Sequence, residues 1–412
     1  MASIVADALA DTRVVLVIGA RQCGKSTLVR MQARESSAQG LKHEWRNLDS
    51  AVTRQAAASD PAGFVDFGEL MVIDEIQRVP ELLLAIKEQV DTDPRPGRYL
   101  LTGSARIFGL RSLPDTLPGR TETVELWPFS QGEIDGRTEG FVDAVFTDSE
   151  ALNHTSTVSR GEYVQRIVRG GFPEAVARAN PARRERFFDS YVADLVARDV
   201  SQLSEIERPA QLRALLRLLA ARSGQLLVGN ALSNDLQVSA RTVHRYLSLL
   251  EEVFLIKRIS AWSRNVSSRA IGTPKVAFVD SGVAGNLLDA DARSLLRPGG
   301  PFGPLLEGFV LMELARQLTW SRRRVELSHY RTKDGIEVDA VLEDRQGRAV
   351  GIEVKASSTV RSDDFRGLRH LADRLGEDFV AGFVLYTGTQ TLPFGPRLRA
   401  MPASALWEIA EP

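Results

Sequence analysis

The stretch Gly19-Ala20-Arg21-Gln22-Cys23-Gly24-Lys25-Ser26 decides the fold of the N-terminal part of the chain. It matches the pattern G-x-x-x-x-G-K-[ST] without a mismatch. In this pattern the glycines let backbone N–H groups wrap around phosphate oxygens, and the following helix adds its positive dipole end. Residues 14–18 (VVLVI) are a continuous apolar run, which is typical of a strand buried on both faces of a parallel sheet. The sequence therefore predicts a strand, this loop and a helix from about Ser26.

The loop residues have predicted roles in holding a nucleotide. Lys25 is expected to reach the β- and γ-phosphates of ATP, and the Ser26 hydroxyl is expected to ligate Mg²⁺. The predicted nucleotide-binding residues are Gly19, Arg21, Gln22, Cys23, Gly24, Lys25, Ser26, Thr27 and Asp74. The alternatives are a glycine-rich surface loop and, for Cys23, a redox role, and the flanking strand and helix argue against the first.

A second apolar run, Leu70-Met71-Val72-Ile73, ends at Asp74 and Glu75. Paired with the phosphate loop about fifty residues upstream, it predicts the acidic partner strand of a nucleotide site. Asp74 is expected to hold the Mg²⁺ shell. Glu75 is expected to act as the general base that activates the attacking water. The alternative is that the two carboxylates only solvate a strand end.

A third apolar run, Tyr99-Leu100-Leu101, ends at Thr102-Gly103-Ser104. Ser104 is expected to orient the attacking water. Arg106 and Arg120 follow closely, and either is a candidate for acting on the γ-phosphate of a neighbouring subunit, as trans arginines do in phosphoryl transfer. The alternative is a surface arginine in each case. An arginine that acts on the nucleotide of a neighbouring subunit requires a homo-oligomer, which we therefore expect.

The whole-chain composition is ordinary for a globular protein. Of the 412 residues 43% are hydrophobic and 25% are charged, and the net charge is −1. Whole-chain electrostatics therefore do not attract the protein to nucleic acid or membrane. Apolar runs stay well short of the roughly 20 residues needed to span a bilayer. The N-terminus does not read as a signal peptide, and the single cysteine excludes a disulfide within the chain. We expect a cytoplasmic protein without a membrane partner.

Changes in pattern along the chain predict four segments. Residues 1–135 alternate strands with helices, which indicates an α/β domain with a parallel sheet. Residues 136–205 contain a polar linker and a helical region. Residues 206–275 read as a winged-helix-like region, with a short helix, a turn, a longer helix and a strand pair over 229–275. Residues 276–412 mix strands and helices and form the last domain.

The longer helix of the third segment predicts a DNA-binding face. Ser239 is a plausible N-cap, and Val243, Leu247 and Leu250 form an inward stripe. The outward stripe consists of Arg241, His244, Arg245 and Ser248. Residues 205–275 carry eleven Lys and Arg against five Asp and Glu, an excess typical of a phosphate-contacting face. The predicted DNA-binding residues are Arg241, His244 and Arg245, and the alternative is a lid or an oligomer contact.

Carboxylates of the last segment predict a metal site by geometry. Glu307 lies on the apolar stripe of a helix from Leu305 to Leu318, where an unpaired carboxylate is costly. Residues 336–343 and 349–356 read as two strands, and a hairpin symmetric about Gln346 would set Asp339 opposite Glu353. Glu353 and Lys355 then project from one face. Glu307, Asp339 and Glu353 are the predicted ligands of Mg²⁺ or Mn²⁺, with Lys355 beside them, and a structural ion-pair cluster around Lys355 is the alternative.

Eight motifs together resemble prokaryotic AAA ATPases that carry a C-terminal domain of unknown function. The motifs are GARQCGKSTL (19–28), VIDEIQ (72–77), LLTGS (100–104), GGFP (170–173), RDV (198–200), FVDSG (278–282), LEGFV (306–310) and IEVK (352–355). The resemblance implies an AAA-type core, a winged-helix region and a C-terminal domain over 276–412 similar to PD-(D/E)xK nucleases. The resemblance also implies that Glu307, Asp339 and Glu353 bind the metal ion and that Lys355 is a catalytic residue. Ala20 stands where the family usually has proline.

Taken together, the sequence predicts an α/β protein that binds ATP and Mg²⁺ and hydrolyses ATP. The leading hypothesis is a nucleotide-driven machine that acts on DNA and has a nuclease-like domain. The first alternative is a slow nucleotide-gated switch that binds a protein or DNA, with an inactive, decayed nuclease-like domain. A small-molecule kinase is a third possibility, and the long accessory segments and the trans-arginine candidates argue against it.

Overall fold

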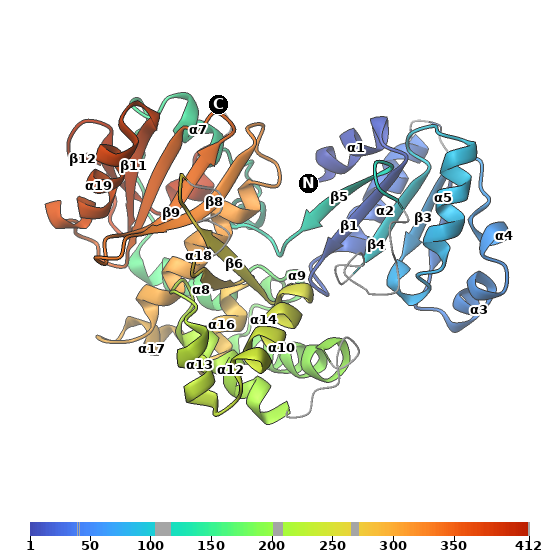
Figure 1. Ribbon diagram of the computed structural model, residues 1–412, viewed down its shortest axis with the longest axis horizontal. Coiled ribbons are helices and arrows are strands. Elements are labelled where there is room, and N and C mark those ends of the chain that lie inside the picture. Colours follow the sequence, from blue (N-terminus) through green and yellow to red (C-terminus); the bar gives the residue numbers. More distant parts are fainter. Residues whose placement is uncertain (39, 41, 104–116, 201–208, 265–271, 411–412) are drawn as a thin grey trace. The chain divides into compact units, whose positions relative to one another are not determined.

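The computed structural model describes residues 1–38, 40, 42–103, 117–200, 209–264 and 272–410 (Figure 1). The chain divides into two compact units. Met1–Pro128 with Glu252–Phe254 forms the N-terminal unit, and Phe129–Glu251 with Leu255–Pro412 forms the C-terminal unit. The predicted segments 136–205, 206–275 and 276–412 thus lie almost wholly in one unit, which also contains residues 129–135.

The N-terminal unit is built on a five-stranded parallel sheet with the strand order β2-β3-β4-β1-β5. The strands are β1 (Val14–Gly19), β2 (His43–Asn47), β3 (Leu70–Asp74), β4 (Tyr99–Gly103) and β5 (Thr121–Leu126). All residues of β1, β3 and β4 are buried, as their continuous apolar runs predict for strands covered on both faces. β4 pairs with both β1 and β3, so it separates the two strands that carry the predicted site.

Helices flank this sheet (Figure 1). They are α1 (Ala2–Asp11), α2 (Lys25–Ala38), α3 (Ala51–Ser59), α4 (Pro61–Val65), the 3₁₀ turn η1 (Ile76–Arg78) and α5 (Leu82–Thr92). α2 begins inside the glycine-containing loop and packs against β1, β3 and β4. Ser50 and Asp60 cap α3 and α4, since the side chain of each accepts a hydrogen bond from a backbone N–H three residues on.

The C-terminal unit contains an eight-stranded mixed sheet with the order β12-β13-β11-β10-β9-β8-β6-β7. The strands are β6 (Ile256–Ala261), β7 (Lys275–Phe278), β8 (Val325–Arg331), β9 (Glu337–Asp344), β10 (Ala349–Lys355), β11 (Phe379–Tyr386), β12 (Leu392–Pro393) and β13 (Leu398–Pro402). β8, β9 and β10 form an antiparallel meander, and β11 then pairs parallel to β10. α19 (Arg366–Leu375) makes the crossover between β10 and β11, as a parallel connection requires.

The helices of the C-terminal unit come mainly before β8. They are α6 (Gln131–Asp135), α7 (Phe141–Thr147), α8 (Arg160–Arg169), α9 (Pro173–Val176), α10 (Pro181–Asp194), the π-helical turn η3 (Leu195–Val200), α12 (Pro209–Ala221), α13 (Gly229–Leu236), α14 (Ala240–Glu252), α16 (Ser281–Leu287), α17 (Ala292–Leu296) and α18 (Phe302–Gln317). α19, two 3₁₀ turns (Ser362–Phe365 and Gly376–Asp378) and α20 (Ala405–Glu408) follow. The predicted order of a short helix, a turn, a longer helix and a strand pair is present as α13, α14, β6 and β7.

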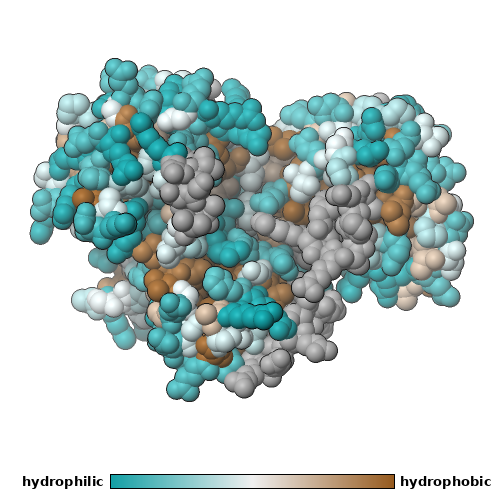
Figure 2. All heavy atoms as spheres, viewed as in Figure 1, coloured by the Kyte–Doolittle hydropathy of each residue, from teal (hydrophilic) through white to brown (hydrophobic). Residues whose placement is uncertain are grey.

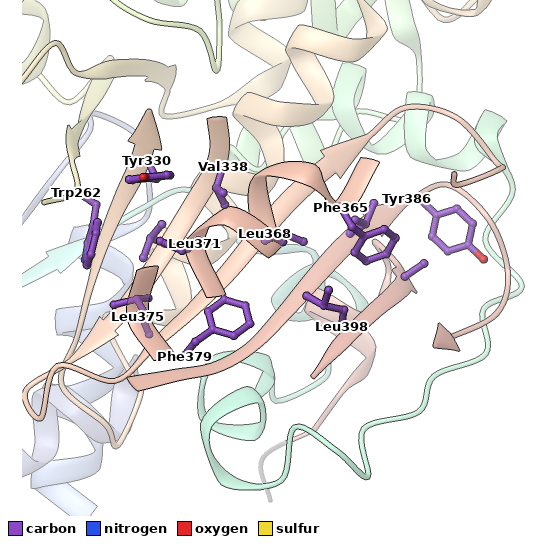
Figure 3. Packing of buried hydrophobic residues seen from close by; sticks show 14 residues of the cluster. Trp262, Tyr330, Val338, Phe365, Leu368, Leu371, Leu375, Phe379, Tyr386 and Leu398 are labelled. Atoms are coloured by element: carbon purple, nitrogen blue, oxygen red, sulfur yellow. The ribbon is translucent and has the colours of Figure 1, made fainter. Parts of the chain in front are cut away.

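The core of the mixed sheet lies between the strands and α19 (Figure 3). Leu368, Leu371 and Leu375 of this helix point onto β9, β10 and β11 and are buried. Gly351 of β10 permits the close approach, because a Cβ at this position would lie 2.6 Å from Leu368 Cδ2. Burial of each leucine contributes about 1.5–3 kcal/mol of stability, so this helix is firmly held on the sheet.

α18 is buried at every residue from 308 to 317, polar residues included. Glu313 accepts hydrogen bonds from Arg316 Nη1 at 2.8 Å and from the backbone N–H of Gln131 at 2.9 Å. The Gln317 side chain accepts one from Val142 N at 3.1 Å and donates one to a backbone carbonyl of α20. Because buried polar groups need partners, these hydrogen bonds fix α6, α7 and the C-terminal end of the chain to α18.

Two of the quoted motifs meet at one buried aspartate. Gly171 N donates to Asp280 Oδ2 at 2.6 Å, and Asp280 Oδ1 accepts from Val283 N at 3.1 Å to cap α16. Gly170 has φ +66°, and a Cβ there would lie 2.3 Å from Asp280 Oδ1. The motifs around residues 170–173 and 278–282 therefore join α8 to α16 and are structural.

Surface hydrophobic residues are scattered. Both units are largely hydrophilic on the face seen in Figure 2. The large apolar side chains that are exposed come from separate elements: Met31, Val52, Leu84, Phe129, Val228, Leu296 and Leu392. Among the described residues, each helix is too short or too polar to cross a membrane.

Candidate functional site

The phosphate-loop sequence forms a tight turn between β1 and α2. Gly19 has φ +154°, and a Cβ on it would lie 2.0 Å from Leu126 O of the neighbouring strand. Gly24, with φ +106°, makes the last step of the turn before α2 begins at Lys25. Both positions need glycine, because side chains rarely adopt this backbone or fit this space. The N–H groups at the start of α2 are thereby placed at the carboxyl end of the sheet.

Lys25 and Ser26 stand at the start of α2 with different partners. Lys25 Nζ donates to Gly19 O at 3.1 Å and to Ala20 O at 2.7 Å, so its ammonium lies within the loop, and the residue is 5% exposed. The Ser26 hydroxyl donates to Asp74 Oδ1 at 2.9 Å. The lysine is thus held by neutral carbonyls, and the aspartate is held by a neutral hydroxyl.

Thr102 links the two predicted acidic residues, and the sequence argument assigned it no role of its own. Its hydroxyl donates to Asp74 Oδ1 at 2.5 Å and accepts from the backbone N–H of Glu75 at 2.9 Å. These hydrogen bonds exist because β4 lies beside β3 in the sheet. Asp74, which is 4% exposed, is therefore fixed by two hydroxyl groups. A polar residue at the end of an otherwise apolar strand is the signal that could have identified Thr102.

Glu75 adopts a backbone conformation that is unusual for its type. Its φ is +63° and its ψ is +46°, in the left-handed region. Such conformations cost free energy and are found where the surrounding structure holds them, often at functional sites. Here the hydrogen bond from Glu75 N to Thr102 holds the backbone. Gln77 Nε2 donates to Glu75 Oε2, so a second group fixes the half-buried carboxylate.

The residues around Asp74 fit the magnesium ion that the phosphate-loop fold implies. Mg²⁺ takes oxygen ligands and is usually bound through one or two protein groups plus substrate phosphates. The Ser26 hydroxyl and the Asp74 carboxylate supply two such oxygens, 2.9 Å apart. In these hydrogen bonds Asp74 accepts only from neutral hydroxyls, those of Ser26 and Thr102. The pair can therefore share a divalent cation with a nucleotide on the loop.

Other loop residues differ in what they offer a ligand. Gln22 and Thr27 are exposed, and Arg21 is half-buried. Cys23 is buried, and its thiol donates to Leu126 O at 3.4 Å. Burial raises the pKa of the Cys23 thiol despite the nearby Lys25 charge. The redox alternative for Cys23 is therefore disfavoured, because the thiolate is the reactive form.

The arginine candidates fall in different places. Ser104 and Arg106 lie outside the described residues. Arg120 directly precedes β5, and its carbonyl accepts a hydrogen bond from Val14 N at the beginning of β1. Its side chain pairs with Asp91 at 2.5 Å. Arg120 thus lies near the amino ends of the strands, whereas the phosphate loop follows the carboxyl end of β1. Arg120 therefore does not reach its own phosphate loop, and a role in a neighbour's site and a surface ion pair with Asp91 remain the two alternatives.

The outward stripe of α14 is arranged as the helical spacing predicts. Arg241, His244 and Arg245 are exposed. On the other side, Val243, Leu247 and Leu250 are buried. Ser239 caps the helix, because its hydroxyl accepts a hydrogen bond from Thr242 N at 3.1 Å.

The C-terminal hairpin has the predicted register. β9 and β10 pair from Ala349↔Glu343 to Ile352↔Ala340, which is symmetric about Gln346. One step further, the same register sets Glu353 opposite Asp339. Val354 N donates to Asp339 Oδ2 at 2.9 Å, and Lys355 Nζ donates to Glu353 Oε1 at 2.9 Å.

Lys275, which was counted above only among the Lys and Arg of residues 205–275, contacts two of these carboxylates. Its ammonium donates to Glu307 Oε1 at 2.5 Å and to Asp339 Oδ1 at 2.8 Å. The described residues contain no group of three or more His, Cys, Asp or Glu side chains arranged to hold a metal ion. The predicted ligands Glu307, Asp339 and Glu353 do lie near one another, but a lysine fills the position expected for the cation. In this arrangement they do not fit Mg²⁺ or Mn²⁺.

Burial and mutual repulsion shift the pKa values of this cluster. Burial and the Asp339 charge raise the pKa of Glu307 to about 8, against the opposing effect of Lys275. Burial and Asp339 likewise raise the pKa of Glu353 to about 7. Burial lowers the pKa of Lys275, but Asp339 and Glu307 outweigh it and the net shift is upward. Lys275 is therefore a stable positive charge.

Comparison with protein families assigns three consecutive parts of the chain. Residues 11–135 match a family described as an AAA domain. Residues 160–294 and 302–406 match two families described as domains of unknown function, DUF8612 and DUF4143. The parallel sheet, the phosphate loop and this match define the N-terminal unit as an AAA-type α/β domain.

The chain is similar to two bacterial proteins that are described as uncharacterized. An uncharacterized protein of Mycobacterium tuberculosis is 29% identical over 401 residues, covering 97% of this chain and 82% of that protein. One of Haemophilus influenzae is 24% identical over 332 residues, covering 74% of this chain and 76% of the other. Among solved structures, AMPPCP-bound DnaA from Aquifex aeolicus gives a TM-score of 0.32 at 14% identity, covering 61% of this chain and 86% of that one.

Proposed function

We propose that the N-terminal unit binds ATP with Mg²⁺ and hydrolyses it. The observation that carries this proposal is the hydrogen bond from the Ser26 hydroxyl of the phosphate loop to the Asp74 carboxylate. Glu75 follows directly after Asp74. It brings a hydroxyl and a carboxylate to the start of a helix, where phosphate groups are bound. The match of residues 11–135 to an AAA domain supports the same function.

The proposed reaction assigns one task to each side chain. Lys25 and the N–H groups of the loop bind the β- and γ-phosphates. Ser26 and Asp74 hold the magnesium ion, which neutralises phosphate charge when it is bound. Glu75 accepts the proton of the water that attacks the γ-phosphorus, and the bond to the β–γ bridging oxygen breaks to release ADP. Thr102 and Gln77 position Asp74 and Glu75.

ATP turnover of the variant Glu75→Gln tests this proposal. The amide keeps the shape of the side chain but cannot accept the proton, so we expect ATP binding to persist while the turnover rate falls about 10²–10⁴-fold. Glu88→Gln, at an exposed position of α5, is the matched control and should leave turnover unchanged. Near-normal turnover of Glu75→Gln would show that Glu75 is not the base.

DNA binding through α14 is a second proposed function. Arg241, His244 and Arg245 form an exposed stripe on the longer helix of a helix-turn-helix pair that is followed by a strand pair. That order is the one expected for a winged helix, whose longer helix contacts DNA. The local excess of Lys and Arg supports an interaction with phosphates.

The salt dependence of DNA binding tests this second function. Replacing Arg241 and Arg245 by alanine should weaken binding and reduce the salt slope by about one for each phosphate that the variant no longer neutralises. The pair Arg293→Ala and Arg297→Ala removes two exposed arginines near α17 and serves as the control. Identical salt slopes for the two double variants would leave α14 as a structural element or an oligomer interface.

The two hypotheses for the whole chain differ in what the C-terminal unit does. The order α18, β8, β9, β10, α19 and β11, with carboxylates on the helix and on the second and third strands, supports a nuclease-like ancestry. The ammonium of Lys275 on Glu307 and Asp339 favours the inactive form, and thus the nucleotide-gated switch. DNA-stimulated ATP turnover by a homo-oligomer would favour the machine, and turnover unaffected by DNA would favour the switch.

A further inference from the structure

Three carboxylates and two lysines form a half-enclosed cluster beside β9 and β10. Lys275 is 3% exposed, and the side chains of Glu307, Asp339 and Glu353 are between 11% and 19% exposed. Lys275 bridges Glu307 and Asp339, while Lys355 pairs with Glu353. Burial lowers the pKa of the neighbouring His329 to about 4, so this imidazole is neutral at pH 7.

We propose that Lys275 is a built-in counter-ion that takes the place of a divalent cation in this cluster, so that the C-terminal unit neither needs nor binds a metal there. A cation shared by Glu307 and Asp339 would need oxygen ligands at about 2.0–2.6 Å on both sides. The Lys275 nitrogen lies in that position, 2.5 Å and 2.8 Å from the two oxygens. A metal and this ammonium therefore exclude each other.

Most of the other oxygens of the cluster already have hydrogen-bond donors. Asp339 Oδ2 accepts the backbone N–H of Val354, so each oxygen of this carboxylate already accepts one hydrogen bond. Glu353 Oε1 accepts from Lys355. Glu353 Oε2 is buried without a hydrogen-bond partner among the described residues, and one such oxygen does not make a divalent site.

The backbone around Lys275 holds the ammonium in place. Lys275 pairs with Ile259 of β6 on one side and forms a bridge with Leu226 on the other. The next residue, Val276, exchanges hydrogen bonds with Gly224 N at 2.7 Å and Gln225 O at 3.1 Å. With strand-like pairing on both sides, β7 cannot shift by itself. Replacing Lys275 is therefore the way to make the position between Glu307 and Asp339 available to a metal ion.

The helix that carries Glu307 is fitted to the same segment. Gly224 has φ +82°, and a Cβ on it would lie 2.8 Å from Glu307 Cβ. Residues 223–227 therefore hold both the strand of Lys275 and the carboxylate that it contacts. Lys275 belongs to β7, which precedes α18 in the chain. The counter-ion is therefore not part of the series of elements from α18 to β11 that carries the carboxylates.

Mn²⁺ binding and thermal unfolding of the full-length chain test the proposal. All proteins carry Asp74→Asn, which silences the proposed metal ligand of the N-terminal unit, and no nucleotide is added. The protein that retains Lys275 should show no saturable Mn²⁺ binding up to millimolar concentration, and its apparent Tm should be the same with Mn²⁺ and with EDTA. Saturable binding that Asp339→Asn abolishes would overturn the proposal.

The variant Lys275→Met should lose stability and gain a metal site. Removing one partner of a buried ion pair leaves the others uncompensated, so we expect the apparent Tm to fall by roughly 10 °C. Mn²⁺ should restore part of this loss and bind once per chain. Lys355→Met, at the more exposed lysine of the cluster, is the matched control and should lose less and gain no site. An unchanged Tm for Lys275→Met would contradict the counter-ion role.

A second variant covers the case in which Lys275→Met does not fold. Lys275→Met combined with Glu307→Gln and Asp339→Asn removes all three charges of the bridge together. This variant should fold, with a Tm above that of Lys275→Met, because buried ion clusters can be replaced as a set. If it also failed to fold, the need for Lys275 would not be electrostatic and the proposal would be wrong.

Discussion

Each unit of the protein has carboxylates near a lysine, and the partner of that lysine differs. In the N-terminal unit, Lys25 donates to two backbone carbonyls, and Asp74 accepts from the hydroxyls of Ser26 and Thr102. In the C-terminal unit, Lys275 donates directly to Glu307 and Asp339. The first arrangement keeps opposite charges apart, and the second joins them.

This difference decides what each cluster can bind. A carboxylate held by neutral hydroxyls keeps its negative charge for a cation, and a lysine held by carbonyls keeps its positive charge for a phosphate. Glu307 and Asp339 already share a buried ammonium, so a second cation gains much less from them. Similar residue types therefore predict a ligand site in one unit and a structural cluster in the other.

Lys25→Ala should have the largest effect on ATP binding by the N-terminal unit. Truncating one partner of a desolvated charge pair costs about 2–5 kcal/mol, so we expect ATP affinity to fall by about 100-fold or more. Thermal stability should change less than in Lys275→Met, because Lys25 bonds only to carbonyls. Titration with a fluorescent ATP analogue measures the affinity, with the exposed Lys42→Ala as the control. Unchanged affinity would show that residues 19–26 are not a phosphate-binding loop. The contrast between the Lys25 and Lys275 clusters would then no longer hold.

Arg120 tests whether the N-terminal site needs a further positive charge from a neighbour. Trans arginines supply on the order of 10³–10⁵ in rate in related phosphoryl-transfer enzymes, so Arg120→Ala should lose most turnover. Mixing it with Lys25→Ala subunits should restore some activity, since one intact site can form between them. Arg95→Ala, at another exposed and ion-paired arginine, is the control. The absence of rescue in confirmed mixed oligomers would count against this role.

Thr102→Val sharpens the contrast between hydroxyl and ammonium partners. It removes the hydrogen bonds that fix Asp74 and Glu75, so we expect turnover to fall about 10–100-fold, as for other residues that orient metal ligands. The unfolding temperature should change little, because no charge loses its counter-ion. Thr92→Val at an exposed position of α5 is the control. Full turnover in Thr102→Val would show that the hydroxyl does not matter.

Glu139 is a third kind of buried carboxylate, and it accepts a hydrogen bond from the backbone N–H of Gly132 at 2.7 Å. Burial and the Glu313 charge raise its pKa to about 8, from 4.5 in the unfolded chain. Between these pH values the folded protein keeps a proton that the unfolded chain has lost, so the free energy of unfolding falls as pH rises. The slope is at most about 1.4 kcal/mol per pH unit.

Unfolding by urea at pH 5 and pH 8 measures this effect. Glu139→Gln should lose less stability over that interval than the wild type, because it carries no titrating proton. Glu150→Gln, at an exposed position, should behave as the wild type does. Equal pH slopes for Glu139→Gln and the wild type would show that Glu139 titrates normally.

The fold was predictable where one local pattern sufficed. The apolar runs at 14–18, 70–73 and 99–101 are strands β1, β3 and β4. The position of β4 between the other two was not predictable, because strand order depends on pairing between distant segments. The burial of Glu313, Arg316 and Gln317 was not predictable either, since some of their partners lie more than eighty residues away.

The candidate sites were likewise predictable where their residues are close in the sequence. The phosphate loop and Asp74 follow from a pattern whose residues meet through one strand and one helix. The hairpin register followed from its short turn. Lys275, which begins the short apolar run KVAFV, was missed because it was counted only among the eleven Lys and Arg of residues 205–275, as part of the proposed phosphate-contacting face. The signal was present, since a lysine at the head of a buried strand needs a buried partner.

The number of Mn²⁺ ions bound per chain tests the central comparison most directly. The wild-type chain is loaded with a non-hydrolysable ATP analogue and Mn²⁺, separated from free ligand, and its bound Mn²⁺ is counted by electron paramagnetic resonance. The account predicts one ion per chain, lost in Asp74→Asn and kept in Asp339→Asn. Two ions per chain, or one ion that is lost in Asp339→Asn and kept in Asp74→Asn, would contradict it.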